Sequence, residues 1–542
     1  MQSLRAAYSR FDTWVKAVAE RTLLTSRIKS FLRDRIDVRQ AEEKIRRDLA
    51  RRSEDFLRVA EAEIYAPRDN PYKRLLNNAG CTFSDLASSV RRHGLEPTLE
   101  RLAAEGVYLT AAEFRGKTDI VRGALRFHAV PADFLRSDTP AGLAIQTGGS
   151  RNAPLRSFLS AERLAEQTPE LAVLFAAHGL GDYAHAVYDA PLPSSGGIKF
   201  LLIYAKMGVR VERWFARAMP ANTRAAAWSH RWLTRAIVFA GSRCGPTFPR
   251  PEPTELADID RIVDWIDAEN RRGISCCVKC GAGNAARVAG AATARNVSLA
   301  GTRFLVGGEP LTQAKREIIE RAGAAAIPRY SFGEGGSVGL GCASPMYADE
   351  VHVSAHRLAL IRRPERAENS AIRPLLFTTF APHEVRLLLN VENGDYAESI
   401  ERNCGCPLER LGLTRHLYGI RSFEKLTSEG MNYFYGDLYE LFEKILPAEF
   451  GGGPGSYQLV EEEDGVGQTR LSLVVDPAIG GLDEARLVAR LQAEFAAGNR
   501  WNSTTARLWA NAGTFRVVRR TPHATARGKI LPLHIARNDR TT

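Results

Sequence analysis

A glycine-rich stretch, GTRFLVGGEPLTQAKREIIERAGAAAIPRYSFGEGG at residues 301–336, constrains the fold of the chain more than any other segment. An apolar run at residues 304–306 stops at paired glycines, and a helical pattern then runs to Ala322, where Gly323 is placed to end the helix. A short apolar segment leads into a second turn at residues 330–334. The order strand, turn, helix, strand predicts two parallel strands whose turns lie at the sheet edge where α/β proteins bind ligands.

The two turns offer complementary ways to hold a nucleotide. The first presents bare backbone, and the second presents an aromatic face followed by a carboxylate, Glu334, that can hold Mg²⁺. We therefore expect the turns to sandwich a nucleotide base and to bind its metal ion. The expected nucleotide contacts are Gly308, Glu309 and Pro310 in the first turn, and Tyr330, Ser331, Phe332 and Gly333 in the second.

Charge and composition narrow the class of ligand and the compartment. The chain has 542 residues, too many for one hydrophobic core, and its net charge of +12 suits anionic ligands such as ATP or CoA. No dense Lys/Arg tract with interleaved aromatic residues is present, so we expect no nucleic-acid partner. No apolar run reaches about 18 residues and no secretory signal is evident. We expect a cytoplasmic protein without a membrane span, whose clustered cysteines are reduced or bind metal.

The motifs of the two turns resemble those of a known enzyme family. Gly-Gly-Glu-Pro-Leu at residues 307–311, followed by Tyr-x-x-x-Glu at residues 330–334, is similar to the AMP-forming acyl-adenylating enzymes, and within them to the phenylacetate–CoA ligase-like branch. The family has Tyr-Gly-x-Ser/Thr-Glu at the second turn, whereas Ser331 replaces the glycine and Gly333 the hydroxyl residue here. The resemblance covers most of the chain in family order, from about residue 67 to about residue 533.

The resemblance implies an adenylate-forming enzyme fold of two parts. We expect a large multi-layer α/β domain at residues 67–420 and a small mobile α+β domain at residues 421–542. Residues 1–66 precede them as a helical extension whose alternating charges indicate a solvated face. Within the small domain, periodicity predicts a helix at 483–497 and strands at 456–461, 470–475 and 514–519.

A second glycine-rich loop lies within residues 144–158, AIQTGGSRNAPLRSF. Backbone N–H groups and side-chain hydroxyls of such a loop can wrap a phosphate, and the family has one at this place. Arg151 stands for a hydroxyl residue, Asn152 for a glycine and Leu155 for a lysine, and a guanidinium can meet a phosphate bidentately. An ordinary Gly/Ser turn is the alternative. The expected phosphate contacts are Thr147, Gly148, Gly149, Ser150 and Arg151.

Three further positions complete the site that the resemblance implies. Asp395 follows a tight turn after an apolar strand, where a carboxylate can take both ribose hydroxyls, and the family has an equivalent Gly-Asp. Arg421 matches an arginine that also approaches the ribose. Lys529, in a Gly-Lys pair, matches the lysine that drives adenylation. The family's Asp-Asp hinge pair between the domains falls on Phe423 and Glu424.

Four side chains with the chemistry of zinc ligands follow the second turn. Cys342, His352, Cys404 and Cys406 form Cys-x9-His…Cys-x-Cys, and three thiolates with one imidazole suit a closed, structural zinc site. Similar patterns in some phenylacetate–CoA ligase-like proteins imply the same. His356 is an alternative fourth ligand, and reduced thiols without metal are the other interpretation.

The resemblance implies ATP-dependent activation of a carboxylic acid, aromatic or acyl, to an acyl-adenylate, followed by transfer to a thiol of CoA or of a carrier protein's phosphopantetheine. Lys529 and Glu334 are the expected catalytic residues, with Glu334 holding Mg²⁺. An amine or hydroxyl acceptor, or a nucleotide-binding protein without catalysis, are the alternatives, and the oligomeric state stays open. Candidates to line the acid pocket are His178, His185, Tyr188 and Lys199.

Overall fold

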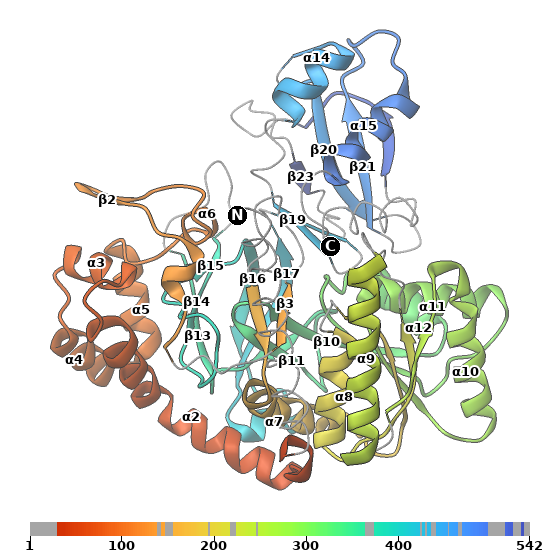
Figure 1. The fold of residues 1–542 in the computed structure, drawn as a ribbon, viewed down its shortest axis with the longest axis horizontal. Helices are drawn as coiled ribbons and strands as arrows, with labels where there is room; N and C mark the ends of the chain where they lie inside the picture. Colours follow the sequence, from red (N-terminus) through yellow and green to blue (C-terminus); the bar gives the residue numbers. More distant parts are fainter. Residues whose placement is uncertain are drawn as a thin grey trace, which may run out of the picture.

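The computed structural model contains a ten-stranded mixed sheet with helices on both sides and a separate four-stranded sheet near the C-terminus (Figure 1). No helix in the described part of the chain is long and apolar enough to cross a membrane. The structure describes residues 30–137, 143–146, 156–192, 196–216, 224–244, 248–363, 373–422, 425–428, 431–434, 441–453, 455–463, 469–496, 515–523 and 533–535.

The large sheet combines a parallel half and an antiparallel half. In spatial order its strands are β16 (Asp395–Glu401), β17 (Arg415–Ser422), β12 (Val351–Val353), β11 (Gly336–Gly341), β10 (Ala325–Phe332), β9 (Arg303–Val306), β8 (Cys276–Cys280), β5 (Ala184–Tyr188), β6 (Val211–Ala216) and β7 (Pro251–Pro253). Pairs from β10 to β7 are parallel, and pairs from β16 to β10 are antiparallel. The carboxyl ends of the parallel strands therefore meet at one edge.

Alternate residues of the parallel strands enter two different cores, because successive side chains of a strand point to opposite faces. In β9, Phe304 and Val306 enter one core and Leu305 enters the other. Covering both faces is what a parallel sheet requires. The helices are α10 (Asp260–Arg271), α11 (Ala282–Ala294) and α12 (Gln313–Arg321) on the first face, and α7 (Ala161–Ala177), α8 (Gly196–Lys206) and α9 (Arg224–Cys244) on the second.

The strand, turn, helix and strand predicted for residues 301–336 are confirmed as β9, α12 and β10. Gly323 follows α12 with a φ of +87°, a left-handed conformation that glycine adopts without strain. One detail differs from the expectation: β10 continues to Phe332, so Tyr330 lies in the strand rather than in the turn.

The N-terminal helices bury apolar side chains in two cores of the main body. α2 (Val38–Ala60) begins after Asp37, whose side chain accepts the Gln40 N–H in a capping box. Only its outer side is a solvated face, because Ile45 joins the core around α7 and Phe56 joins a second core. That second core lies between the helices α3 (Pro71–Asn78), α4 (Phe83–His93) and α5 (Leu95–Ala104) and a sheet of β13 (Leu358–Arg362), β14 (Leu375–Thr379) and β15 (Val391–Glu392).

The C-terminal residues form a small α+β unit with its own core. The elements of this unit include four that lie close to the positions that periodicity predicted and a last strand that was not predicted. They are β20 (Tyr457–Glu463), β21 (Thr469–Val475), α15 (Glu484–Ala496), β22 (Phe515–Arg519) and β23 (Leu533–Ile535), with the strand order β22-β21-β20-β23. The predicted hinge residues Phe423 and Glu424 lie outside the described residues.

Candidate functional site

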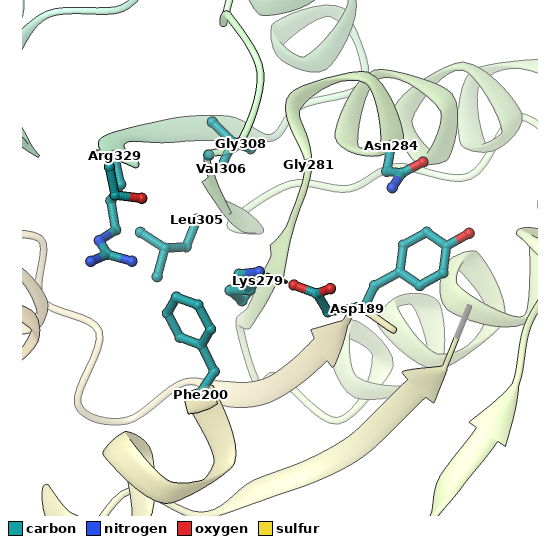
Figure 2. Close-up of a pocket in the computed structure, with 12 residues that line it drawn as sticks. Asp189, Phe200, Lys279, Gly281, Asn284, Leu305, Val306, Gly308 and Arg329 are labelled. Atoms are coloured by element: carbon teal, nitrogen blue, oxygen red, sulfur yellow. Dashed lines mark hydrogen bonds and ion pairs between the residues drawn. The ribbon is translucent and has the colours of Figure 1, made fainter. Parts of the chain in front are cut away.

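A cavity of about 200 Å³ opens at the carboxyl ends of the parallel strands. Tyr188 ends β5, Val306 ends β9, and Lys279 lies near the end of β8. Because these ends meet at one edge, side chains from distant segments face a common space (Figure 2). The cavity is lined by Tyr188, Asp189, Phe200, Lys279, Gly281, Asn284, Leu305, Val306, Gly307, Gly308, Arg329 and Ser331.

The first glycine turn borders this cavity with its backbone. Gly308 has a φ of +83°, which favours glycine. Gly307 lies so close to β10 that a Cβ atom there would sit 3.0 Å from the carbonyl oxygen of Arg329. Gly307 therefore has little room for a side chain and the conformation of Gly308 favours glycine, so a ligand in the cavity would meet bare backbone at this turn.

The remaining residues of the first turn hold it in place. The Glu309 side chain is 3% exposed, and its Oε1 accepts the Gly283 N–H at 2.9 Å in the first turn of α11. A carboxylate at a helix N-terminus is favourable because of the unpaired N–H groups there. The carbonyl oxygen of Pro310 accepts a hydrogen bond from Lys315 Nζ at 3.3 Å. The Glu309 carboxylate thus joins the turn after β9 to α11, and its predicted nucleotide contact remains a prediction.

Tyr330 and Asp395, which are 65 residues apart, are directly hydrogen-bonded. The Tyr330 hydroxyl donates to Asp395 Oδ2 at 2.7 Å, and the Asn393 amide donates to the same oxygen at 2.7 Å. The Ser422 hydroxyl donates to Asp395 Oδ1 at 2.5 Å. Burial and the neighbouring Asp395 charge raise the pKa of Tyr330 well above its ordinary value, so it remains a donor. The residues predicted for the base and for the ribose therefore form one cluster.

The two residues after Tyr330, Ser331 and Phe332, lie in different surroundings. Ser331 lines the cavity. Phe332 packs against Phe377 with ring centroids 4.7 Å apart, and its ring lies where a Cβ at Gly335 would be. The Phe332 side chain therefore packs against the second core, and its predicted nucleotide contact remains a prediction.

A buried charge network supports the turn that carries Glu334. Arg163, on α7, donates to the Gly333 carbonyl at 2.9 Å and to Glu384 Oε2 at 3.0 Å. Arg357 binds Glu384 as well and lies 3.1 Å from Glu170. Burial alone would raise the pKa of the Glu384 carboxyl, but the two arginines lower it, and the net shift is downward. Three distant segments supply this network, and no local pattern in the sequence indicated it.

Glu334 itself lies in the turn between β10 and β11, half-buried. Its charge acts on Arg386: burial lowers the pKa of that guanidinium, and Glu334 opposes the shift. The carboxylate therefore lies at the same end of the sheet as the cavity, beside the Arg163 network. This position is compatible with the predicted metal-binding role.

Arg421 has a protein partner at the end of β17. Its Nη1 donates to Asp349 Oδ2 at 2.7 Å. Asp349 also accepts the backbone N–H groups of Gly419 and Ile420, both at 2.9 Å. Since Tyr396 pairs with Arg421 and Asp395 with Ser422 in the sheet register, Arg421 lies one residue along from the Asp395 cluster. Its predicted role at the ribose remains a prediction.

The other predicted site residues have different outcomes. Tyr188 lines the cavity, whereas His185 is buried against Phe175 and has its Nε2 3.0 Å from the Leu180 carbonyl oxygen. Burial lowers the pKa of His185 to about 4, so it is a neutral core residue. The predicted phosphate loop (Thr147, Gly148, Gly149, Ser150 and Arg151) and Lys529 lie outside the described residues.

The four predicted zinc ligands come together in the antiparallel half of the sheet. The Sγ atoms of Cys342, Cys404 and Cys406 and a ring nitrogen of His352 all lie within 4.8 Å of one another. His352 Nδ1 lies 2.5 Å from the Leu413 carbonyl oxygen, and its Nε2 lies 3.1 Å from Cys406 Sγ. A proton on Nδ1 leaves Nε2 with its lone pair toward the thiols, the arrangement that metal-binding histidines use.

Neighbouring groups affect the three thiols differently: the hydrogen bond to Cys406 raises the pKa of Cys342, and burial raises the pKa of Cys404. Hydrogen bonds from Cys342 and His352 lower the pKa of the Cys406 thiol. Arg402 lies 3.8 Å from Cys342 Sγ and also binds Glu350. The donor set and its spacing fit a four-coordinate zinc ion. His356, the alternative ligand, is not part of the cluster, because its Nε2 lies 3.5 Å from Glu170 in the charge network instead.

Comparisons with known proteins give matches to solved structures only. No protein-family model and no curated protein matches the chain. The chain is similar to 2-hydroxyisobutyryl-CoA ligase in complex with 2-HIB-AMP and CoA, with a TM-score of 0.52 and 14% identity over 93% of this chain and 92% of that one.

Two other solved structures match less well. o-Succinylbenzoate CoA synthetase from Bacillus subtilis has a TM-score of 0.42 and 12% identity over 73% of this chain and 69% of that one. The amide bond synthetase McbA from Marinactinospora thermotolerans has a TM-score of 0.42 and 13% identity over 85% of this chain and 92% of that one. The match to 2-hydroxyisobutyryl-CoA ligase shows the fold, and the predicted adenylate-forming enzyme fold is therefore confirmed.

Proposed function

We propose that this chain is an AMP-forming acid–thiol ligase of the phenylacetate–CoA ligase-like kind. One observation carries the proposal: the glycine turn after β9 and the end of β10, which bear the two adenylation motifs, border the same cavity at the carboxyl edge of the parallel strands. An acyl group in that cavity would lie against the backbone of Gly307 and Gly308. We place this chemistry in the cytoplasm, where ATP and CoA are available and thiols stay reduced.

In the first step, a carboxylate oxygen of the acid attacks the α-phosphorus of ATP, and the bond to pyrophosphate breaks. Positioning and charge neutralisation lower the barrier in such a displacement. Lys529 would contact both the acid carboxylate and the α-phosphate, and the loop from Thr147 to Arg151 would hold the β- and γ-phosphates. Mg²⁺, bound by Glu334, would neutralise phosphate charge.

The nucleoside would bind across the Tyr330–Asp395 cluster. We propose that adenine lies between the first turn and the Tyr330 ring, and that the ribose hydroxyls bind Asp395 by replacing the Ser422 hydrogen bond at Oδ1. Asn393 holds the other oxygen in place. Arg421 would reach the ribose from β17.

In the second step, the sulfur of a thiol attacks the acyl carbon, AMP leaves, and the thiol proton passes to solvent. The acceptor is CoA or a carrier protein's phosphopantetheine. We propose that the C-terminal unit turns about residues 423–424 between the steps, which withdraws Lys529 and admits the acceptor. The Cys342, His352, Cys404 and Cys406 cluster would hold a structural zinc ion that joins β11 and β12 to the segment after β16.

The experiment that tests the proposal is ATP–pyrophosphate exchange with a panel of aryl and aliphatic carboxylic acids. We expect acid-dependent exchange that falls by about 100-fold or more in Lys529→Ala. Arg527→Ala removes a positive charge from the same segment and is expected to keep most of the activity.

The changed phosphate loop, with Arg151, Asn152 and Leu155, favours one rival, a nucleotide-binding protein without catalysis. No exchange with any acid, in a protein that binds ATP by calorimetry, would support that rival. If exchange occurs but the acyl group is transferred to an amine or hydroxyl acceptor and not to a thiol, only the second step of the proposal would change.

A further inference from the structure

Arg329 reaches the cavity without a hydrogen-bonding partner among the described residues. It lies in β10, directly before Tyr330, and its guanidinium carbon is 5.4 Å from the centre of the Phe200 ring. Its Nε is buried and has no hydrogen-bond partner, and none of the described carboxylates forms an ion pair with it. An arginine side chain has five N–H donors and normally satisfies them when it is buried.

Two carboxylates, one at the cavity wall and one whose charge acts on Arg329, are already bound by other cations. Asp189 forms an ion pair with Lys279 at the cavity wall (Figure 2). Glu170 is bound by Arg357 at 3.1 Å, and only its more distant charge acts on Arg329. No described carboxylate therefore pairs with the positive charge of the Arg329 guanidinium.

Two lysines interact with Arg329 or with its neighbour Phe200. Lys279 Nζ lies 4.4 Å from the centre of the Phe200 ring, so this ring contacts both Lys279 and Arg329. Burial lowers the pKa of Lys199, at the start of α8, to about 7, and the positive charge of Arg329 contributes to that shift. The walls between the charged groups are apolar, with Leu305 and Val306 from β9. The cavity thus combines an apolar body with a cationic corner.

Arg329 lies on the side of β10 opposite to the nucleotide cluster. Successive residues of a strand point to opposite faces, and its neighbour Tyr330 points to Asp395. A ligand bound by Arg329 would therefore lie across β10 from the Tyr330–Asp395 pair.

We propose that the acid activated by this chain carries a second anionic group, a carboxylate in the first instance, which binds the guanidinium of Arg329 in the cavity. This inference rests on the proposed function. One carboxylate would be adenylated, and the second would form a bidentate pair with the planar guanidinium, the geometry that arginine favours for carboxylates. The apolar walls would take the chain or ring between the two groups.

The test compares acids that differ only by the second carboxylate. The pairs are 4-methylbenzoate with terephthalate, and hexanoate with adipate, in ATP–pyrophosphate exchange. We expect kcat/KM to favour the diacid of at least one pair by about 10- to 100-fold, the range of a charge-assisted pair. Arg329→Met should abolish the preference, and Arg329→Lys should keep part of it because the charge remains.

Arg321→Met is the matched control, since Arg321 is exposed at the end of α12 and removal of its charge should leave the preference unchanged. A preference for the monoacids would overturn the inference, and so would an equal loss of kcat/KM for both members of a pair in Arg329→Met. In either case, acid-dependent exchange would still support the proposed ligase activity.

If no acid supports exchange, calorimetric titration of terephthalate and adipate decides the inference separately. Binding that is lost in Arg329→Met would support the anion site in a protein that is not a ligase. Absence of binding in the unmodified chain would overturn it.

Discussion

The Cys/His cluster and the cavity occupy the two halves of one sheet, and they differ in how completely their polar groups are partnered. In the cluster, His352 binds the Leu413 carbonyl, and Arg402 joins Cys342 to Glu350. In the cavity, Arg329 faces open space, and none of the described residues accepts a hydrogen bond from its Nε. A closed set of ligands is typical of a structural metal site, and convergent polar groups in an apolar cavity are typical of a binding site.

The largest expected effect is at the closed site. We expect Cys406→Ser to remove bound zinc and to lower the free energy of unfolding by roughly 3 kcal/mol or more, because metal binding stabilises the folded state directly. Zinc content per chain and urea denaturation measure the two effects. Cys276→Ser is the control, since Cys276 is a buried thiol in β8 outside the cluster. Equal zinc contents in the two variants would favour reduced thiols without metal.

A second expected effect concerns the buried charge network that supports the Glu334 turn. Arg163→Met removes one of the two arginines that bind Glu384 and frees the Gly333 carbonyl. Breaking a buried ion pair costs about 3–5 kcal/mol, and we expect about 3 kcal/mol because Arg357 still binds Glu384. We also expect the KM for MgATP to rise several-fold, since the turn that holds Glu334 loses its support. Arg321→Met serves as the exposed control, and an unchanged KM would show that the network acts on stability alone.

The local elements of this fold were predictable, and the contacts between distant elements were not. Periodicity and turn chemistry located β9, α12 and the Gly323 cap, because each depends on neighbours in the sequence. The four residues predicted as zinc ligands could be named at large separations in the sequence because few side chains have their donor chemistry, and the structure brings them together. The remaining agreement, the adenylate-forming fold, came from the order of motifs along the chain.

What the sequence did not indicate depends on tertiary contacts. The hydrogen bond between Tyr330 and Asp395 needs β10 and β16 to approach across the sheet. The Glu309 carboxylate binds the first turn of α11 because a buried carboxylate requires a partner. In the sequence, Arg329 is only the charged residue of the segment that forms β10. Its significance appears in the fold, where none of the described residues forms a hydrogen bond with its buried Nε.

A third expected effect is a pH dependence of stability that arises at His356, in the buried charge network. Burial lowers the pKa of His356 to about 4, with Glu170 opposing the shift, against about 6.5 in the unfolded chain. The unfolded chain therefore binds more protons below pH 6.5, so stability falls as the pH drops from 6.5 toward 4. Between pH 7 and pH 5 this histidine should cost roughly 2 kcal/mol.

His356→Gln tests this dependence by removing the titrating group. We expect urea denaturation at pH 7 and pH 5 to show a smaller loss of stability in the variant than in the unmodified chain. The control is His93→Gln, at the exposed end of α4. Glu170 and Glu384 do not confuse the comparison, because their folded pKa values are lowered and their contribution is lost only at more acidic pH. Identical slopes in all three proteins would show that His356 accepts a proton in the folded state.

The smallest expected effect concerns the Asp189–Lys279 ion pair at the cavity wall. Asp189→Asn neutralises the partner of Lys279, whose side chain is 14% exposed against 25% for Asp189. We expect about 1 kcal/mol of lost stability, because the pair is partly solvated and the amide oxygen of asparagine can still accept the Ala190 N–H. The freed ammonium adds positive charge beside Arg329, so the KM for terephthalate should fall several-fold while that for 4-methylbenzoate stays constant. Equal changes for both acids would mean that the pair only holds the ends of β5 and β8 together, and that the cationic corner consists of Arg329 alone.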